Sequence, residues 1–331
     1  MIKETRITLK NVGKINPGKI ENYIAAGGYQ TLAKALTQQP TKIIDEMVNS
    51  SLRGRGGAGF STGLKEKFTS ESCKTCRDRY IICNADEGEP GTFKDRIIME
   101  NDPHLLIEGM LIAAYSISAT KAYIYIRGEY YLSIQRIQEA IQQASEVGFV
   151  GKNILGSGFS IEIKVYLGGG SYLCGEELTL LESLEGKRGY PRIKPPFPAE
   201  KGLFGAPTLV NNVETLATIP TIIDKGASWY SKLGTEDSPG TKIFTISGDV
   251  KKPGYYEVQM GVSLREIIFD LAGGMRGKHK FKAALIGGAA GSFIDATVLD
   301  TPVSFDLLKA QGVVLGSGAI IVLNQERSLI K

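Results

Sequence analysis

The chain has 331 residues, which is enough for roughly two domains that each bury a core of their own. Its composition, 42% hydrophobic and 22% charged, is that of an ordinary soluble globular protein. The 39 basic and 35 acidic side chains leave a net charge of only +4, and they are mixed along the sequence without a Lys/Arg block. Nucleic-acid binding and a polybasic membrane patch are therefore not indicated.

The N-terminal stretch lacks the apolar core of a signal peptide, and the longest apolar stretch contains Glu108 and is too short to span a bilayer. We expect a cytoplasmic protein, or a subunit that lies peripherally on a membrane complex without inserting into it. Two histidines, His104 and His279, do not favour a catalytic triad or a multi-histidine metal site. Four cysteines, two of them in the Cys73-x-x-Cys76 pair, are a weak signal for zinc or an iron–sulfur cluster, so we expect reduced thiols and no metal.

The first predicted helix covers residues 41–52 and leads into a glycine-rich segment, SSLRGRGGAGFSTGLKEKF. Gly54, Gly56 and Gly59 match GxGxxG, but a dinucleotide fingerprint follows a strand, and this one follows a helix. We interpret the segment as a glycine loop between two helices.

Four other side chains of this segment suit a nucleotide. Arg55 and Lys65 flank the glycine backbone in a manner suited to phosphate. Phe60 and Phe68 are either stacking surfaces for adenine or simply core residues.

Strands then alternate with helices, which predicts parallel crossovers and a doubly wound, Rossmann-like α/β sheet. The predicted strands cover residues 78–84, 121–126 and 161–167, and the predicted helices cover 104–119 and 131–147. The third strand runs into a triple glycine at 168–170 and then a helix from Glu176, a second candidate phosphate or flavin loop with a plain tight turn as the alternative.

An acidic loop follows the first of these strands, with Asp86, Glu87 and Glu89 within four positions. These carboxylates suit the hydroxyls of a ribose or ribityl chain. A metal site, an acid/base pair and a solvated acidic turn are the alternatives.

The proline-rich segment 189–202 is expected to be an irregular lid, followed by a helix over 211–226 with Asn211 or Asn212 as its N-cap. A linker-like loop at 235–241 places the domain boundary, giving domains 1–239 and 240–331. A hairpin, one short helix and returning strands in the second part predict a ubiquitin-like β-grasp domain.

The chain lacks a GxxxxGK[ST] loop and an activated nucleophile, so a bound flavin or nicotinamide nucleotide fits better than hydrolytic chemistry. Five motifs point the same way, and in their order they resemble the NADH-binding FMN flavoprotein subunit of respiratory complex I and of NAD-linked soluble hydrogenases and formate dehydrogenases. These motifs are GRGGAGF, CNADEGEPGTFKDR, YLCGEE, KPPFP and NNVETL.

The resemblance implies noncovalent FMN that takes a hydride from NADH and passes single electrons to iron–sulfur centres. It implies no catalytic side chain, because the hydride passes directly between the cofactors while Glu89, bridged by Tyr172, positions the nicotinamide. The implied FMN residues are Gly54, Arg55, Gly56, Lys65, Asn84, Asp86, Tyr172, Gly175, Glu176, Asn211, Asn212 and Thr215. The implied NADH residues are Phe60, Phe68, Glu87, Glu89, Glu177, Lys194 and Phe197.

This chain departs from the family pattern at Ser61, where proline is usual, and at Glu66, where tryptophan is usual; both changes are expected to border the nucleotide cavity. Family members also continue into a helical domain that holds a four-iron cluster, whereas this sequence stops at Lys331. The cluster is then expected on a missing domain or on a partner, with the Cys73/Cys76 pair as a minor candidate for a shared site.

The expected partners are NADH and iron–sulfur subunits, including a thioredoxin-like [2Fe-2S] subunit. Because Glu87 and Glu89 would repel a 2′-phosphate, NADH is expected over NADPH. The alternatives are a subunit of an electron-bifurcating or ion-pumping complex that works toward NAD reduction, and a non-catalytic scaffold of the same fold.

Overall fold

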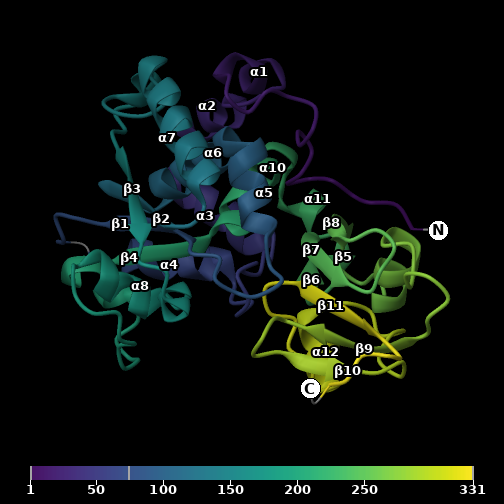
Figure 1. Ribbon diagram of the computed structural model, residues 1–331. Helices are drawn as coiled ribbons and strands as arrows, with labels where there is room; N and C mark the ends of the chain where they lie inside the picture. The colour runs from purple at the N-terminus through teal and green to yellow at the C-terminus, as the bar shows by residue number, and fades with distance from the viewer. Residues whose placement is uncertain (1, 74, 330–331) are drawn as a thin grey trace.

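A four-stranded parallel sheet forms the centre of the first part of the chain (Figure 1). The computed structural model describes residues 2–73 and 75–329. The strands are β1 Tyr80–Ala85, β2 Lys121–Arg127, β3 Glu162–Gly168 and β4 Thr208–Asn212, in the order β3-β2-β1-β4. The three predicted strands are confirmed, while β4 was not predicted. The chain moves outward from β1 through β2 and β3 and returns on the other side of β1 as β4, so β1 and β4 form the topological switch point.

Helices cover both faces of this sheet, which confirms the doubly wound class. On one face Ile81, Cys83 and Ile124 share a core with α6 and α10, and on the other Ile82 and Tyr125 pack with α8. The helices are α1 Ile20–Ala25, α2 Gln30–Leu36, α3 Pro40–Asn49, α4 Thr62–Glu71, α5 Lys94–Asn101, α6 Pro103–Ser116, α7 Tyr131–Glu146, α8 Glu177–Leu184, α9 Pro198–Lys201, α10 Val213–Lys225 and α11 Ala227–Tyr230. Three short 3₁₀ turns are η1 Ile154–Gly156, η2 Tyr172–Gly175 and η3 Leu203–Gly205.

The glycine-rich segment lies between α3 and α4, as predicted. Ser61 caps α4 by accepting a hydrogen bond from the backbone N–H of Leu64. Asn212 caps α10 in the same way through the N–H of Glu214, which resolves the alternative between Asn211 and Asn212. The lid segment is irregular apart from the single turn of α9.

The second part of the chain forms a five-stranded mixed sheet in the order β10-β9-β11-β7-β8, drawn green to yellow in Figure 1. Only β7 and β11 pair in parallel, so the last strand lies beside the first, as in a β-grasp fold. Its elements are β7 Thr241–Gly248, β8 Gly254–Gln259, η4 Glu266–Leu271, β9 Phe281–Ile286, β10 Ser292–Ile294, α12 Phe305–Ala310 and β11 Ala319–Asn324. The predicted linker contains a small hairpin of β5 Gly234–Thr235 and β6 Ser238–Pro239. We keep the division at residue 239 as a proposal, which a separate core drawn from Phe244 to Val322 supports.

The N-terminal residues tie the two parts together. The N–H of Thr5 donates to the carbonyl oxygen of Glu257 at 2.9 Å, and the buried Glu257 carboxylate accepts hydrogen bonds from the N–H groups of Ile7, Thr8 and Leu9. Residues assigned to the first domain from the sequence therefore also fasten the edge strand β8 of the second.

The expectation of reduced thiols is wrong for one pair of cysteines. Cys73 and Cys76 form a disulfide, and their Cα atoms lie 5.5 Å apart in the turn after α4, within the range that a disulfide spans. Cys83 and Cys174 are free and buried. Within residues 2–73 and 75–329, no three His, Cys, Asp or Glu side chains cluster in a way that could hold a metal ion. No helix in the described part of the chain is long and apolar enough to cross a membrane.

Candidate functional site

Two adjoining cavities of about 330 and 840 Å³ open at the carboxyl ends of β1 and β4. This is the switch point, where open α/β sheets bind their ligands, and both volumes are of the size that ligand sites have. The residues that line both cavities are Gly56, Gly57, Asn84, Gly175, Glu176 and Asn212. The two cavities therefore form one continuous cleft.

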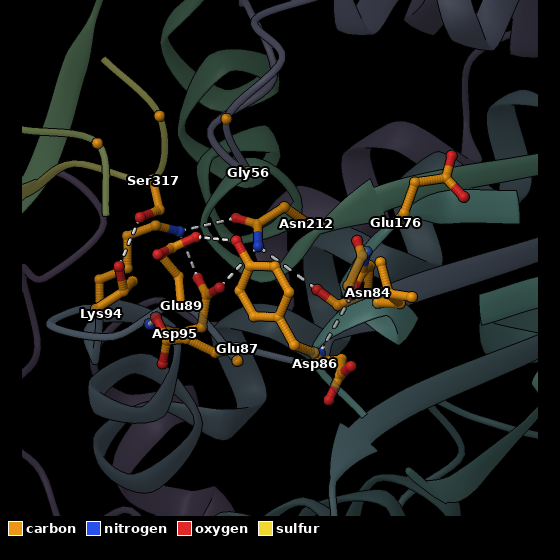
Figure 2. A pocket seen from close by; sticks show the side chains of 18 residues that line it. Gly56, Asn84, Asp86, Glu87, Glu89, Lys94, Asp95, Glu176, Asn212 and Ser317 are labelled. Atoms are coloured by element: carbon orange, nitrogen blue, oxygen red, sulfur yellow. Dashed lines mark hydrogen bonds and ion pairs between the residues drawn. The ribbon is translucent and has the colours of Figure 1, made fainter. Parts of the chain in front are cut away.

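The smaller cavity lies between the acidic loop and the second sheet (Figure 2). Asp86, Glu87 and Glu89 line it from the first part of the chain. Figure 2 shows Ser317, from the turn before β11, on the opposite side of the pocket from Asn84 and Glu176. The Nδ2 of Asn84 donates to the carbonyl oxygen of Gly175 at 2.8 Å, which joins the end of β1 to the turn before α8.

The larger cavity exposes aromatic rings. Phe60, Phe68 and Phe197 line it and are 49%, 49% and 53% exposed, so the interpretation of Phe60 and Phe68 as core residues is wrong. Three large apolar side chains that meet at one cavity are suited to stacking on a planar ligand. Lys194, which precedes Phe197 in the lid segment, also lines the cavity.

Two buried polar atoms at the cleft have no hydrogen-bond partner among residues 2–73 and 75–329. They are Oδ2 of Asp86 and Nδ2 of Asn211, in residues only 9% and 5% exposed. Because an unpaired buried polar atom is costly, each is suited to bind a ligand group. Burial raises the pKa of Asp86 to about 6, against the opposing charge of Arg127. An acceptor and a donor of this kind, beside a glycine backbone, fit the hydroxyls of a ribityl chain.

An ion-pair network joins α4, α8 and the lid at the larger cavity. The Nζ of Lys65 lies 3.0 Å from Oε2 of Glu177 and donates to the carbonyl oxygen of Val210 at 2.9 Å. The Nζ of Lys194 lies 3.0 Å from Oε1 of Glu177 and 3.3 Å from Oε1 of Glu176. Burial alone would raise the pKa of Glu177, but the two lysines outweigh it and hold the pKa below its ordinary value.

All the predicted site residues except Arg55 line one cavity or both. The side chain of Arg55 is fully buried away from the cleft, where Nη2 donates to the hydroxyl of Tyr230 and to the carbonyl oxygen of Pro239. Its predicted contact with a phosphate is therefore corrected. Its backbone N–H donates to Thr215 Oγ1 at 2.8 Å and so helps to shape the glycine loop.

Glu87 and Asn212 also line the cleft, but their side chains already form hydrogen bonds within the protein. The Glu87 carboxylate is buried and accepts hydrogen bonds from the N–H groups of Asp95 and Arg96 at the start of α5. Burial raises its pKa to about 7. The amide of Asn212 accepts from Lys94 and donates to Asp95. The side chains of Glu87 and Asn212 therefore have fewer polar atoms left to bind a ligand than the sequence indicated.

The triple glycine at 168–170 lines neither cavity, so the predicted phosphate or flavin loop stays a prediction. The same connection reaches the cleft further along, through Gly175 and Glu176. Glu176 caps α8 by accepting hydrogen bonds from the N–H groups of Leu178 and Thr179.

Several lining residues were missed from the sequence: Thr92, Lys94, Asp95, Gly287, Gly316 and Ser317. Lys94 and Asp95 stand inside a quoted motif, and two opposite charges at the start of the helix that follows the acidic loop were an available signal. The three residues of the second sheet carried no such signal, because glycine and serine in turns are common.

Glu66 does not border the cavity, contrary to expectation. It is fully buried on the far side of α4, where Ser116 Oγ donates to its Oε2 at 3.2 Å and its Oε1 has no partner in the described part of the chain. Burial raises its pKa from 4.5 to about 8, although the Ser116 hydroxyl opposes the shift. Ser61, the other departure from the family pattern, acts as the cap of α4.

Glu66→Gln is expected to remove a decline in stability between about pH 4.5 and 8. Native Glu66 keeps a proton that the unfolded chain releases near its ordinary pKa of 4.5, so the free energy of unfolding falls as pH rises through this window. Glutamine does not titrate, so the variant should be more stable than the parent above pH 8, by roughly 1–3 kcal/mol. Urea unfolding between pH 5 and 9 measures the difference. The exposed Glu71→Gln, on the same helix, is the control, and parallel pH profiles for parent and Glu66→Gln would contradict the assignment.

The cleft lies at the switch point of the sheet, exposes phenylalanine rings and offers polar atoms that suit a ribityl chain. Together with the β-grasp domain beside it, these features define a nucleotide- or flavin-binding α/β protein. Known proteins of this class match the chain. The family model described as the Nuo51 FMN-binding domain matches residues 47–221, and the SLBB domain matches residues 243–289. An NADH-quinone oxidoreductase subunit of Aquifex aeolicus (strain VF5) is 52% identical over 98% of this chain and 74% of its own length.

Two further relatives give the same result. The NADP-reducing hydrogenase subunit HndC of Solidesulfovibrio fructosivorans is 46% identical over 99% of this chain and 66% of its own length. A crystal structure of an NAD+-reducing [NiFe]-hydrogenase in the H2-reduced state superposes with a TM-score of 0.82 at 35% identity, over 98% of this chain. This chain spans 52% of that hydrogenase chain.

The chain belongs to the Nuo51 FMN-binding family. The predicted family and fold class are thereby confirmed, and so is the assignment to flavoprotein oxidoreductase subunits that use FMN and NAD(H).

Proposed function

We propose that the chain is the NADH-binding FMN flavoprotein subunit of a multi-subunit redox complex, in which it acts as an NADH:acceptor oxidoreductase. The observation that carries this proposal is the cleft itself: the unpaired Asp86 and Asn211 stand at the switch point, beside exposed phenylalanine rings. FMN, when bound, accepts a hydride from NADH and releases electrons one at a time to iron–sulfur centres.

The residues of this chain would bind and orient the cofactors, without an acid or base on a side chain. Asp86, Asn211 and the glycine backbone would hold FMN, while Phe60, Phe68 and Phe197 would stack on NADH. Glu89 would position the nicotinamide. Uptake of FMN by purified protein, followed by bleaching with NADH under anaerobic conditions, tests the proposal. A chain that takes up no FMN would support a non-catalytic scaffold instead.

NADH is expected to reduce the bound flavin at a concentration at least about 10-fold lower than NADPH, a difference of roughly 1.4 kcal/mol. Lys65 and Lys194 are the lysines that line the larger cavity in the described part of the chain, and both pair with Glu177, so neither is free for a 2′-phosphate. An anaerobic titration with each nucleotide measures the ratio. Glu177→Gln removes the ion pair of Lys65 and leaves Lys194 only its 3.3 Å contact with Glu176, so it should narrow the ratio. Equal bleaching of the parent by both nucleotides would contradict the prediction.

The electron-transfer partners proposed are iron–sulfur subunits, including a thioredoxin-like [2Fe-2S] subunit, and we place the chain in the cytoplasm or peripherally on a membrane complex. The likeness to an NAD+-reducing hydrogenase favours a second direction, in which the partners supply electrons for NAD+ reduction. Copurification followed by iron analysis, and then by reduction of the isolated complex with hydrogen or with NADH, distinguishes the two directions.

A further inference from the structure

A turn of the second domain touches Glu89. The turn follows β9 and consists of Gly287, Gly288 and Ala289. The backbone N–H of Ala289 donates to Oε1 of Glu89, and the hydroxyl of Tyr172 donates to Oε2 of the same carboxylate at 2.5 Å. Each carboxylate oxygen of Glu89 is therefore held by one donor, and the two donors come from opposite domains.

Gly288 leaves room for this carboxylate. An added Cβ at Gly288 would lie 2.1 Å from Cδ and 2.2 Å from Oε1 of Glu89, closer than real atoms approach. Its φ of +95° also lies in the region that glycine favours. The turn thus brings its backbone, and not a side chain, against Glu89.

The rest of the acidic loop is fastened to the same domain. Thr245 Oγ1, on β7, donates to the carbonyl oxygen of Gly91 at 2.7 Å. The hydroxyls of Thr92 and Ser317 lie 2.5 Å apart. Three residues of the acidic loop, Glu89, Gly91 and Thr92, therefore form hydrogen bonds with the second domain.

We propose that the turn Gly287–Ala289 is a positioning element of the nicotinamide site, so that the second domain sets the affinity for NADH. The inference rests on the proposed function and adds to it a part for the β-grasp domain. A free glutamate side chain must be immobilised when a ligand binds, whereas the amide of Ala289 and the hydroxyl of Tyr172 fix Glu89 in advance. Immobilising a side chain on binding has a free-energy cost. Loss of the contacts that fix Glu89 in advance is therefore expected to weaken nucleotide binding about 10-fold.

Gly288→Ala tests the inference, because the new methyl group displaces the Glu89 carboxylate. We expect the Kd for NAD+, measured by calorimetry, and the KM for NADH to rise about 10-fold, while the FMN content stays unchanged. In the Glu89→Ala background, which lacks Cγ, Cδ and Oε1, the new methyl group has no carboxylate to displace, so Gly288→Ala should lower the affinity little further. A purely structural defect would lower the affinity in the Glu89→Ala background as much as in the parent.

Gly312→Ala is the matched control. Gly312 belongs to the same domain, has a φ of +71° and has no atom within 4 Å of its added Cβ, so it introduces similar backbone strain without contact to Glu89. Should Gly288→Ala fail to fold, Thr245→Val removes one hydrogen bond to the acidic loop without added bulk, and we expect it to raise the Kd for NAD+ about 3-fold.

The inference would be overturned if Gly288→Ala bound NAD+ with native affinity or lost no more affinity than Gly312→Ala. If Gly288→Ala does not fold, native NAD+ affinity in Thr245→Val would overturn it. In those cases the parent still takes up FMN and is bleached by NADH, so the proposed function stands. A parent that binds neither FMN nor NADH would overturn both.

Discussion

Glu214→Ala is expected to lower the free energy of unfolding by about 3–5 kcal/mol, because it leaves two buried lysines without their shared counter-ion. Glu214 is 1% exposed, and its Oε2 lies 3.0 Å from Nζ of Lys94 and 3.3 Å from Nζ of Lys242. Its Oε1 accepts a hydrogen bond from the N–H of Ile243 at 2.8 Å. The carboxylate thus joins α10 to β7 and to the helix that follows the acidic loop.

The electrostatics explain why this residue matters more than either lysine. Burial alone would raise the pKa of Glu214, but Lys242, Lys94 and Arg55 outweigh it and hold the pKa below its ordinary value of 4.5. The ion pair therefore adds stability above pH 4.5 that is lost as pH falls through the native pKa. Burial lowers the pKa of Lys242 to about 8, although Glu214 opposes the shift. Lys242→Met should therefore cost less than Glu214→Ala, since Glu214 keeps Lys94 as a partner.

Urea unfolding at pH 7 measures the effect, with Asp300→Ala as the control. Asp300 forms an ion pair with Arg265 on the surface, and its removal is expected to leave the unfolding midpoint unchanged within error. A midpoint for Glu214→Ala that matches the parent would show that the buried network does not stabilise the protein.

Gly56→Val is expected to weaken FMN binding by roughly 100-fold, the equivalent of about 3 kcal/mol of steric overpacking. Gly56 lines both cavities, and an added Cβ would lie 3.1 Å from Cβ of Asn212. The further methyl groups of valine would occupy space in the cleft at a residue that both cavities share. The φ of Gly56 is not left-handed, so the loss would come from the blocked space and not from backbone strain.

Titration of flavin-free protein with FMN, followed by fluorescence quenching, gives the two dissociation constants. Gly169→Val is the matched control, because Gly169 is exposed, has no atom within 4 Å of its added Cβ and lines neither cavity. If Gly56→Val were purified with a full complement of FMN, the cleft would not be the flavin site.

Local patterns predicted most of the elements. The apolar residues at helical spacing in α3, and the buried run that forms β1, specify their structure through neighbours in the sequence. The strand β4 was missed because its five residues lead directly into the cap of α10, so the helix signal masked it. The helix after the glycine loop was also predicted, but the role of Ser61 as its cap was not.

Site residues were predicted to the extent that their chemistry depends on side chains at fixed spacing. Asp86 directly follows β1 and Asn211 lies near the carboxyl end of β4, and these two strands pair in parallel, so both residues reach the same edge of the sheet. Arg55 was assigned to the wrong place because two neighbours in a loop can point in opposite directions. Its guanidinium donates hydrogen bonds to Tyr230 and Pro239, which lie far along the chain.

The sequence by itself determined the class of this protein: a glycine loop between helices, carboxylates after a strand and a second domain of returning strands. Only the tertiary structure decided what holds those residues in place. Glu89 is held by the backbone N–H of Ala289, 200 positions along the chain, and Glu214 is surrounded by lysines from two other elements. A backbone amide is common to nearly every residue type, and a buried charge depends on what packs over it, so neither contact leaves a pattern in the sequence.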